Sequence, residues 1–228
     1  MAGGKRAPEA VRTRFVEVAA EVLENAPLPG TRLYWAVLRV PGTFPEPVPG
    51  QFVMVSPNLA RAAGQLLSRP FSIARCIPDG DGWKLGILYA RVGKGTDLMA
   101  RAGGGTWTVL GPLGRGFEAD HKGPALLVAG GRGTAPLVFL AEWLEARGRG
   151  CEFLIGARTA ADWAGPAELD RLTGLFDSVV FGNEIPGAAP AVRVRKWTGE
   201  VRYKLAGAGA AAARPIVAHH AATLMRLT

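Results

Sequence analysis

The stretch ALLVAGGRGTAPL, residues 125–137, decides how the second half of this chain is interpreted. Its apolar run at 126–129 predicts a buried strand, and the apolar residues that follow Pro136 predict a helix. Three glycines lie between the expected strand and the expected helix, so the backbone of this turn is not covered by side chains. Backbone amides and the helix dipole at such a turn can receive an anionic ligand group. We therefore interpret residues 130–136 as a nucleotide-binding turn.

A second string, Arg-Pro-Phe-Ser at 69–72, lies 61 positions before the glycine turn. It predicts an extended strand end that presents a cation and a hydroxyl. A guanidinium can hold a pyrophosphate through paired hydrogen bonds, and a hydroxyl can meet the edge of a flavin ring. Taken alone, the string would equally describe a strand end without a ligand. In this order, however, the two strings indicate a flavin site followed by a nicotinamide site.

Two further strings lie between these motifs. The segment Leu-Tyr-Ala at 88–90 leads into Gly-Lys-Gly-Thr at 93–96, where glycines before a helix, with Thr96 as the cap, predict a second anion-binding nest. A plain capped turn would have the same residues. The string Gly-Pro-Leu-Gly-Arg-Gly-Phe at 111–117 then closes the first half with backbone that must bend or pack closely.

The spacing of apolar runs divides the 228 residues into two expected domains, 1–121 and 122–228. Short runs separated by Pro- and Gly-rich turns predict a small antiparallel β-barrel in the first, with strands at 13–22, 32–39, 51–55, 70–77, 83–91 and 106–110. The second alternates strand and helix, which predicts a parallel sheet with helices on both faces. Its expected strands are 125–129, 152–156, 178–182 and 215–218, and its expected helices are 136–147, 166–176 and a short one at the end. The Ala/Gly run at 206–213 is expected to be a loop or a poor helix end.

Charge and cysteine usage narrow the class of protein. The net charge is +8, but the basic residues are scattered and are not interleaved with a stacking aromatic array, which disfavours nucleic-acid binding. A basic cofactor groove and an acidic protein partner both remain compatible with this charge. Cys76 and Cys151 lie in separate apolar runs, so we expect no disulfide framework. With no secretory signal and no apolar run of membrane-spanning length, we expect a cytoplasmic protein.

Together and in this order, the four glycine-rich and Arg-Pro-Phe-Ser strings resemble the ferredoxin–NADP reductase superfamily. Within it they are most similar to the electron-transfer subunit of dihydroorotate dehydrogenase, a likeness that Gly-Ala-Arg-Thr at 156–159 extends. The resemblance implies an N-terminal FAD-binding β-barrel and a C-terminal α/β domain that binds NAD(P)H. It also implies that a hydride passes from NAD(P)H to FAD, and that single electrons then pass to a catalytic partner subunit in a hetero-oligomer of pyrimidine biosynthesis.

The resemblance also implies the cofactor contacts of individual residues. FAD would be held by Arg69, Pro70, Phe71, Ser72, Leu88, Tyr89, Ala90, Gly95 and Thr96. The nicotinamide dinucleotide would be received by Gly130, Gly131, Gly133, Thr134, Ala135 and Pro136, with Arg158 near its adenosine end. Arg158 alone does not make a site for a 2′-phosphate, so the choice between NADH and NADPH stays open. The resemblance identifies no catalytic residue beyond these cofactor contacts.

Three departures from the family pattern leave the reaction itself open. The family's subunit carries four cysteines near its C-terminus for a [2Fe–2S] cluster, whereas Cys76 and Cys151 cannot build one, so this sequence does not support the cluster. Truncation, divergence or a partner's cofactor would each account for this. His219-His220-Ala221 stands where the family has Cys-Gly-Pro; adjacent histidines point differently, and with only His121 besides them we expect no metal site. Arg132 in the glycine turn could bind phosphate or obstruct the nicotinamide.

These departures support a second hypothesis. The chain would then be a non-catalytic or regulatory member that keeps the fold, with or without FAD, but has lost oxidation of NAD(P)H. Purified protein that is yellow but is not bleached by NADH or NADPH would favour this alternative.

Overall fold

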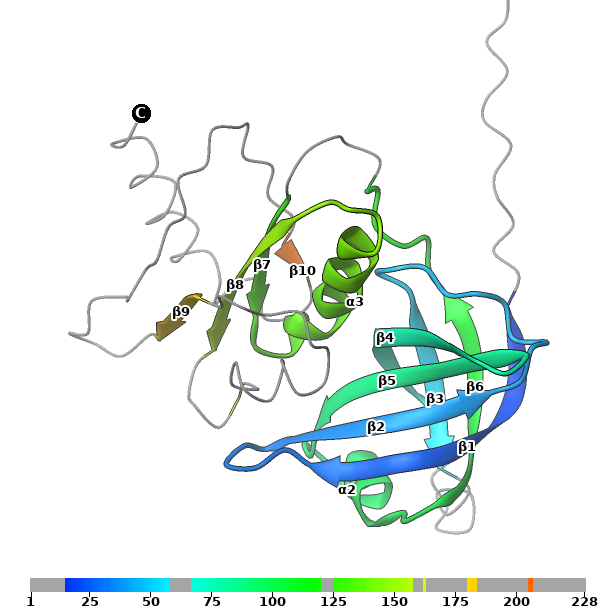
Figure 1. Ribbon diagram of the computed structural model, residues 1–228. Coiled ribbons are helices and arrows are strands. Elements are labelled where there is room, and N and C mark those ends of the chain that lie inside the picture. The colour runs from blue at the N-terminus through cyan, green and yellow to red at the C-terminus, as the bar shows by residue number, and fades with distance from the viewer. Residues whose placement is uncertain are drawn as a thin grey trace, which may run out of the picture.

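The computed structural model describes residues 15–57, 67–119, 125–157, 162, 180–183 and 205–206. Within these residues the chain forms a closed β-barrel and a separate parallel sheet, joined through one long helix (Figure 1). The barrel strands are β1 (Val16–Pro27), β2 (Leu33–Val40), β3 (Phe52–Pro57), β4 (Arg69–Asp79), β5 (Gly82–Ala90) and β6 (Gly105–Leu113).

The predicted antiparallel barrel is confirmed. Neighbouring strands follow the order β1-β2-β5-β4-β3-β6, every pair is antiparallel, and β1 closes the barrel against β6. Alternate residues of each strand point inward, as the pleat requires, and form one apolar cluster. Its members include Ala20, Leu38, Val53, Val55, Ile87 and Val109, all fully buried.

Strand β1 is longer than the sequence predicts. The apolar alternation of the sequence ends at Val22, but the strand continues to Pro27. A shift in register between Val22 and Glu24 interrupts the pairing with β2, after which Asn25 lies opposite Ala36. A bulge of this kind inserts a residue and breaks the period of two, so the pattern could not show the strand's true end.

Helix α2 (Lys94–Arg101) follows β5 after a short turn. The residue that caps this helix is Gly93, not Thr96 as the sequence suggested. Thr96 lies inside the first turn, and its hydroxyl oxygen accepts hydrogen bonds from the backbone N–H groups of Val92 at 2.9 Å and Gly93 at 3.2 Å. A side chain of the first helical turn therefore satisfies these two backbone donors, which precede the helix.

The second sheet is parallel, with the order β10-β7-β8-β9. Its strands are β7 (Ala125–Gly130), β8 (Cys151–Ala157), β9 (Val180–Asn183) and β10 (Leu205–Ala206). The short turn η1 (Gly131–Gly133) and helix α3 (Thr134–Glu145) connect β7 to β8, as predicted for a strand–helix–strand unit. Strand β10 was missed, because its two residues border an Ala/Gly run. The helix expected at 166–176, the strand expected at 215–218 and the short terminal helix lie outside the described residues.

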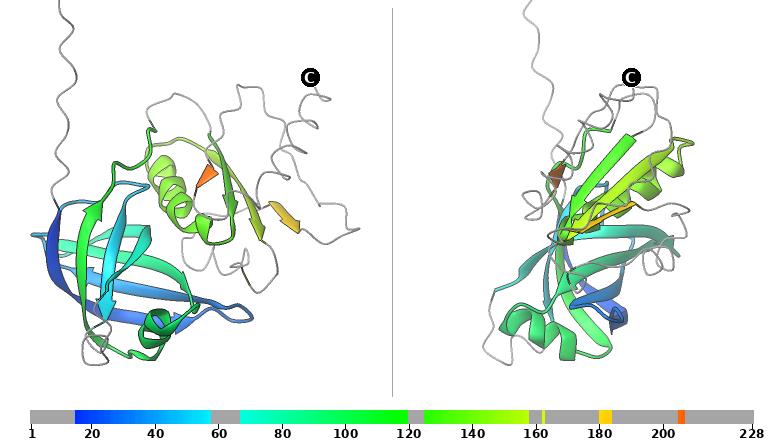
Figure 2. Two further views of the ribbon diagram at one scale, coloured as in Figure 1. Left: turned by 180° about the vertical axis from the view of Figure 1, so that it is seen from behind. Right: turned by 90° about the vertical axis from the view of Figure 1, so that its left-hand side faces the viewer.

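Helix α3 begins two residues before the predicted start at Pro136, since proline is tolerated in a first turn, where the backbone N–H groups have no partner within the helix. Every residue from Thr134 to Ala141 is buried. The helix lies between the parallel sheet and the barrel, beside β4 (Figures 1 and 2). Leu137, Leu140 and Leu144 form one apolar cluster with Leu127 of β7 and with barrel residues Trp35, Ala74 and Leu88. A helix buried on both sides is apolar all round, which explains its sequence.

Candidate functional site

Three of the sequence motifs meet at one end of the barrel. Strands β4 and β5 are antiparallel, with Ile73 opposite Ile87, so the start of β4 lies beside the end of β5. Helix α2 begins directly after β5 and therefore reaches the same end. Residues 69–72 and 88–90 are thus brought together by strand pairing, and residues 95–96 by the short turn from β5 into α2.

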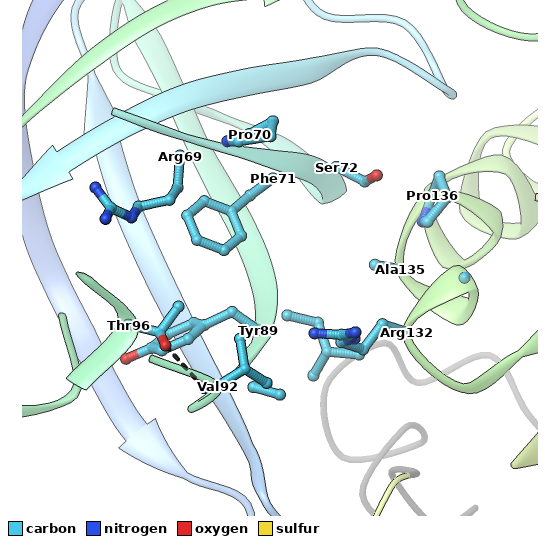
Figure 3. A pocket seen from close by; sticks show the side chains of 13 residues that line it. Arg69, Pro70, Phe71, Ser72, Tyr89, Val92, Thr96, Arg132, Ala135 and Pro136 are labelled. Carbon is cyan, nitrogen blue, oxygen red and sulfur yellow. Dashed lines mark hydrogen bonds between the residues drawn. The ribbon is translucent and has the colours of Figure 1, made fainter. Parts of the chain in front are cut away.

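A cleft of about 320 Å³ lies between this end of the barrel and the start of α3 (Figure 3). Such a volume is within the usual range for ligand sites. Eleven residues expected to bind a cofactor line it, namely Arg69, Pro70, Phe71, Ser72, Leu88, Tyr89, Ala90, Thr96, Gly133, Ala135 and Pro136. Val92 and Arg132 also line it and were not among the expected cofactor residues. Gly95, Gly130, Gly131 and Thr134 do not line it, and Arg158 lies outside the described residues.

The position of Arg69 depends on a glycine. A Cβ atom on Gly95 would lie 2.1 Å from Nε and 2.3 Å from Cζ of Arg69. The guanidinium therefore occupies space that any other residue at position 95 would fill. Arg69 also donates from Nη1 to the carbonyl oxygen of Leu67. The absence of a side chain at position 95 thus leaves room for a half-buried cation at the edge of the cleft.

Tyr89 forms one wall of the cleft and is held in place by several contacts. Its hydroxyl donates to Oδ1 of Asn25 at 2.8 Å, and its ring stacks on Tyr34 with centroids 5.3 Å apart. Phe71 meets the same ring edge-on at 5.9 Å. Burial raises the pKa of Tyr89, so its hydroxyl stays protonated at neutral pH and acts as a hydrogen-bond donor. We infer that Tyr89 supports the site rather than exchanging protons in it.

The opposite wall is the glycine turn at the start of α3. Gly131 has φ 51°, a conformation that suits glycine. The hydroxyl of the buried Thr134 donates to the carbonyl oxygen of Gly131 at 2.7 Å and holds the turn closed. This bond explains why Thr134 does not face the cleft, whereas Ala135 and Pro136 do (Figure 3).

The cleft is apolar and positively charged. Its lining includes the cations Arg69 and Arg132 and no carboxylate. Arg132 is exposed, and its guanidinium points from the glycine turn toward the Tyr89 and Val92 side of the cleft (Figure 3). The nearby Asp97 is already paired with Arg91 at 2.8 Å. The arrangement suits an elongated anionic ligand with a flat apolar part.

A second cleft, of about 500 Å³, lies between β4 and α3 and contains none of the sequence motifs. Arg75 and Glu142 meet there, with Nε and Oε1 2.8 Å apart. Burial raises the pKa of Glu142 to about 7, despite the opposing effect of Arg75. Burial likewise raises the pKa of Cys76 to about 12, so this thiol is protonated and unreactive at neutral pH. We therefore take the smaller cleft, where the motifs meet, as the candidate site.

Within the described part of the chain, no three His, Cys, Asp or Glu side chains gather in a way that could hold a metal ion. His121, His219, His220 and the missing Cys-Gly-Pro position all lie outside it, so the expectation about metal stays a prediction. In the same described residues, no helix has the length and apolar character needed to cross a membrane.

Several solved structures that share this fold are named as reductases. A cytochrome P450 reductase from Amycolatopsis superposes with a TM-score of 0.55 and 26% identity, covering 75% of this chain and 52% of that one. The ferredoxin reductase of carbazole 1,9a-dioxygenase gives a TM-score of 0.60 at 21% identity, covering 77% and 54%. Phthalate dioxygenase reductase gives 0.56 at 18% identity, covering 74% and 52%. The fold is therefore that of the ferredoxin reductase-like proteins.

Curated relatives narrow the similarity further, although no family model matches the chain. It is 45% identical over 117 residues to the electron transfer subunit of dihydroorotate dehydrogenase B (NAD(+)) from Bacillus caldolyticus. The identity to the subunit of the same name from Geobacillus kaustophilus is 44%, again over 117 residues. These comparisons confirm the resemblance drawn from the motifs. Each match covers 50% of this chain and 44% of the relative, so the chain spans about half the length of the curated relatives it matches.

Proposed function

We propose that this chain is a flavoprotein electron-transfer subunit that binds FAD in the cleft between the barrel and α3 and accepts electrons from NAD(P)H. The observation that carries the proposal is the convergence on one cleft of residues 69–72, 88–90 and 96 with the glycine turn before α3. When bound, FAD would supply the chemistry: it takes up a hydride and releases electrons singly.

The chain's own residues would bind and orient that group. Arg69, held beside Gly95, would pair with the pyrophosphate, because a guanidinium matches phosphate oxygens with two parallel hydrogen bonds. Ser72 would donate a hydrogen bond to the edge of the ring. Phe71, packed edge-on against Tyr89, would fix the slot for the ring and exclude water from one side of it.

The division into an FAD-binding domain, 1–121, and an NAD(P)-binding domain, 122–228, is part of the proposal. Support for the second domain comes from the parallel order of β7, β8 and β9 and from the glycine turn at the carboxyl end of β7. Ligands of open parallel sheets bind at that end of the strands. Gly130, Gly131 and Thr134 would shape the turn that receives the dinucleotide, and Arg158 would lie near its adenosine end.

The partner is also a proposal. The curated relatives are named as electron transfer subunits of dihydroorotate dehydrogenase B, and we propose that this chain serves a similar catalytic subunit in a hetero-oligomer. Phthalate dioxygenase reductase, which shares the fold, is described as a modular structure for electron transfer from pyridine nucleotides to [2Fe–2S]. We propose that the flavin passes its electrons to a cofactor of the partner subunit.

An absorbance spectrum of the purified full chain tests the proposal. We expect a yellow protein, or one that turns yellow with added FAD, whose flavin absorbance bleaches anaerobically with NADH or NADPH. A chain that remains colourless after incubation with FAD would overturn it. A yellow chain that neither nucleotide bleaches would instead identify a member that has kept the fold and the flavin without oxidising NAD(P)H. Stoichiometric iron in the full chain would contradict the proposed exit of electrons.

A further inference from the structure

Arg132 lines the cleft, but the contacts proposed above for FAD and NAD(P)H give it no role. It belongs to the turn η1 and is carried on the wall opposite Arg69, so that the two cations face the same cleft from different elements (Figure 3). Among the described residues, Arg132 has no hydrogen bond to a side chain and no ion pair. By contrast, Arg91 is paired with Asp97, and Arg75 of the second cleft is paired with Glu142.

The surroundings of Arg132 make an incoming negative charge favourable. The described lining of the cleft contains no carboxylate that could neutralise it. The turn that carries Arg132 also begins α3, so the positive end of the helix dipole adds to the same potential. Much of the cleft wall is apolar, and charge interactions are weakened less beside such a wall than in open water.

We propose that Arg132 tunes the flavin: from the wall opposite the barrel it stabilises the negative charge that reduction places on the ring. This inference rests on the proposed function. Uptake of two electrons and one proton leaves the flavin ring with one negative charge more than the oxidised ring. A cation beside the ring therefore favours reduced over oxidised FAD and raises the reduction potential. Arg132 is a positioning and tuning residue here, since it transfers neither the hydride nor a proton.

The expected change in reduction potential follows from one unit charge that acts on the flavin ring across a partly exposed cleft. Such an interaction changes the preference for the reduced form by about tenfold. For a two-electron couple, a tenfold change corresponds to about 30 mV. Arg132→Gln should lower the potential of bound FAD by about that amount, and Arg132→Lys should retain most of the wild-type value because the charge is kept.

The test is a redox titration of bound FAD in the full chain, with the affinity for oxidised FAD measured in parallel. Arg101→Gln is the matched control: Arg101 is an exposed cation in the last turn of α2, does not line the cleft, and should leave the potential unchanged. A wild-type potential in Arg132→Gln would overturn the inference. Tighter binding of oxidised FAD by that variant would also overturn it, because Arg132 would then obstruct the site. Wild-type protein that takes up no FAD would refute the proposed function itself.

Discussion

Because Gly95 has no side chain, the guanidinium of Arg69 can occupy its position in the candidate site. The Cβ atom that any substitution would add lies 2.1 Å from Nε of Arg69, closer than non-bonded atoms approach. The obstacle is the far end of a flexible side chain, so the fold can adapt by moving the guanidinium. Consequently a change at Gly95 affects the cation and not the barrel.

We expect Gly95→Ala to weaken FAD binding about tenfold, the usual worth of one charge-assisted contact to phosphate. Its free energy of unfolding should stay within about 1 kcal/mol of wild type. The dissociation constant from a fluorescence titration with FAD, together with urea unfolding, checks both. Gly103→Ala is the matched control, since nothing lies within 4 Å of the Cβ position there. Equal affinity in Gly95→Ala and wild type would show that Arg69 does not hold the cofactor.

At the scale of residues, sequence patterns could indicate which side chains gather but not how each is oriented. Arg69, Phe71 and Ser72 were predicted because they follow one another in a recognisable string. Thr134 belongs to an equally recognisable string, but its hydroxyl bonds back to Gly131 and turns away from the cleft. Such a local bond depends on turn geometry, which the identity of the residues does not determine. The place of Arg132 in the cleft was left open for the same reason.

Between elements, Asn25 joins a strand, a helix and the wall of the site. Its Nδ2 donates to the carbonyl oxygens of Met99 at 2.7 Å and Ala102 at 2.9 Å, at the end of α2. Its Oδ1 accepts from the hydroxyl of Tyr89. The last carbonyls of a helix lack donors within the helix, and here the side chain of Asn25 in β1 donates to two of the carbonyls at the end of α2. Asn25 therefore connects β1 and α2 to the wall of the cleft on β5.

We expect Asn25→Ala to lower the free energy of unfolding by about 1–3 kcal/mol, because it leaves two carbonyls and one hydroxyl without this partner. Tyr89→Phe removes only one of the three bonds and should cost about 1 kcal/mol. Urea unfolding of both variants and of the double variant gives the coupling energy between the two side chains. Additive losses would contradict a direct contact between them.

Elements with regular periodicity could be predicted, and those that depend on tertiary contacts could not. All six barrel strands and the unit of β7, α3 and β8 follow from apolar patterns and from Gly- and Pro-rich punctuation. The extension of β1 beyond Val22 depends on pairing with β2 across a bulge, and Asn25 gives no apolar signal. Strand β10 has two residues, Leu205 and Ala206, which is too short for any period to show.

Across the whole molecule, the barrel and the parallel sheet are joined through α3. The apolar contacts of this helix with both parts are accompanied by a charged contact, Arg75 of β4 with Glu142 of α3. The side chain of Glu142 is only 14% exposed. Removing a carboxylate from water is costly, and here the cost exceeds the attraction of Arg75, since the pKa of Glu142 rises to about 7.

This pKa predicts how the stability of the whole chain depends on pH. The ordinary value is 4.5, so between about pH 4.5 and 7 the folded state holds a proton on Glu142 that the unfolded state has lost. Stability therefore falls as pH rises through this window and levels off above it. The contribution of this one group is about 3 kcal/mol, from 1.36 kcal/mol for each pKa unit between 4.5 and about 7. Cys76 is not part of this change, because its pKa is about 12.

We expect Glu142→Gln to remove this dependence, because a neutral amide has no proton to lose. Near pH 4.5 the variant should match wild type to within about 1 kcal/mol, whereas at pH 8 it should be the more stable of the two. Urea unfolding at several pH values measures the difference, in which the titration of all other groups cancels. Glu145→Gln, three residues along the same helix and exposed, is the matched control and should keep the wild-type dependence. If Glu142→Gln lost stability from pH 5 to 8 as steeply as wild type, the buried carboxylate between barrel and helix would not be the group that titrates.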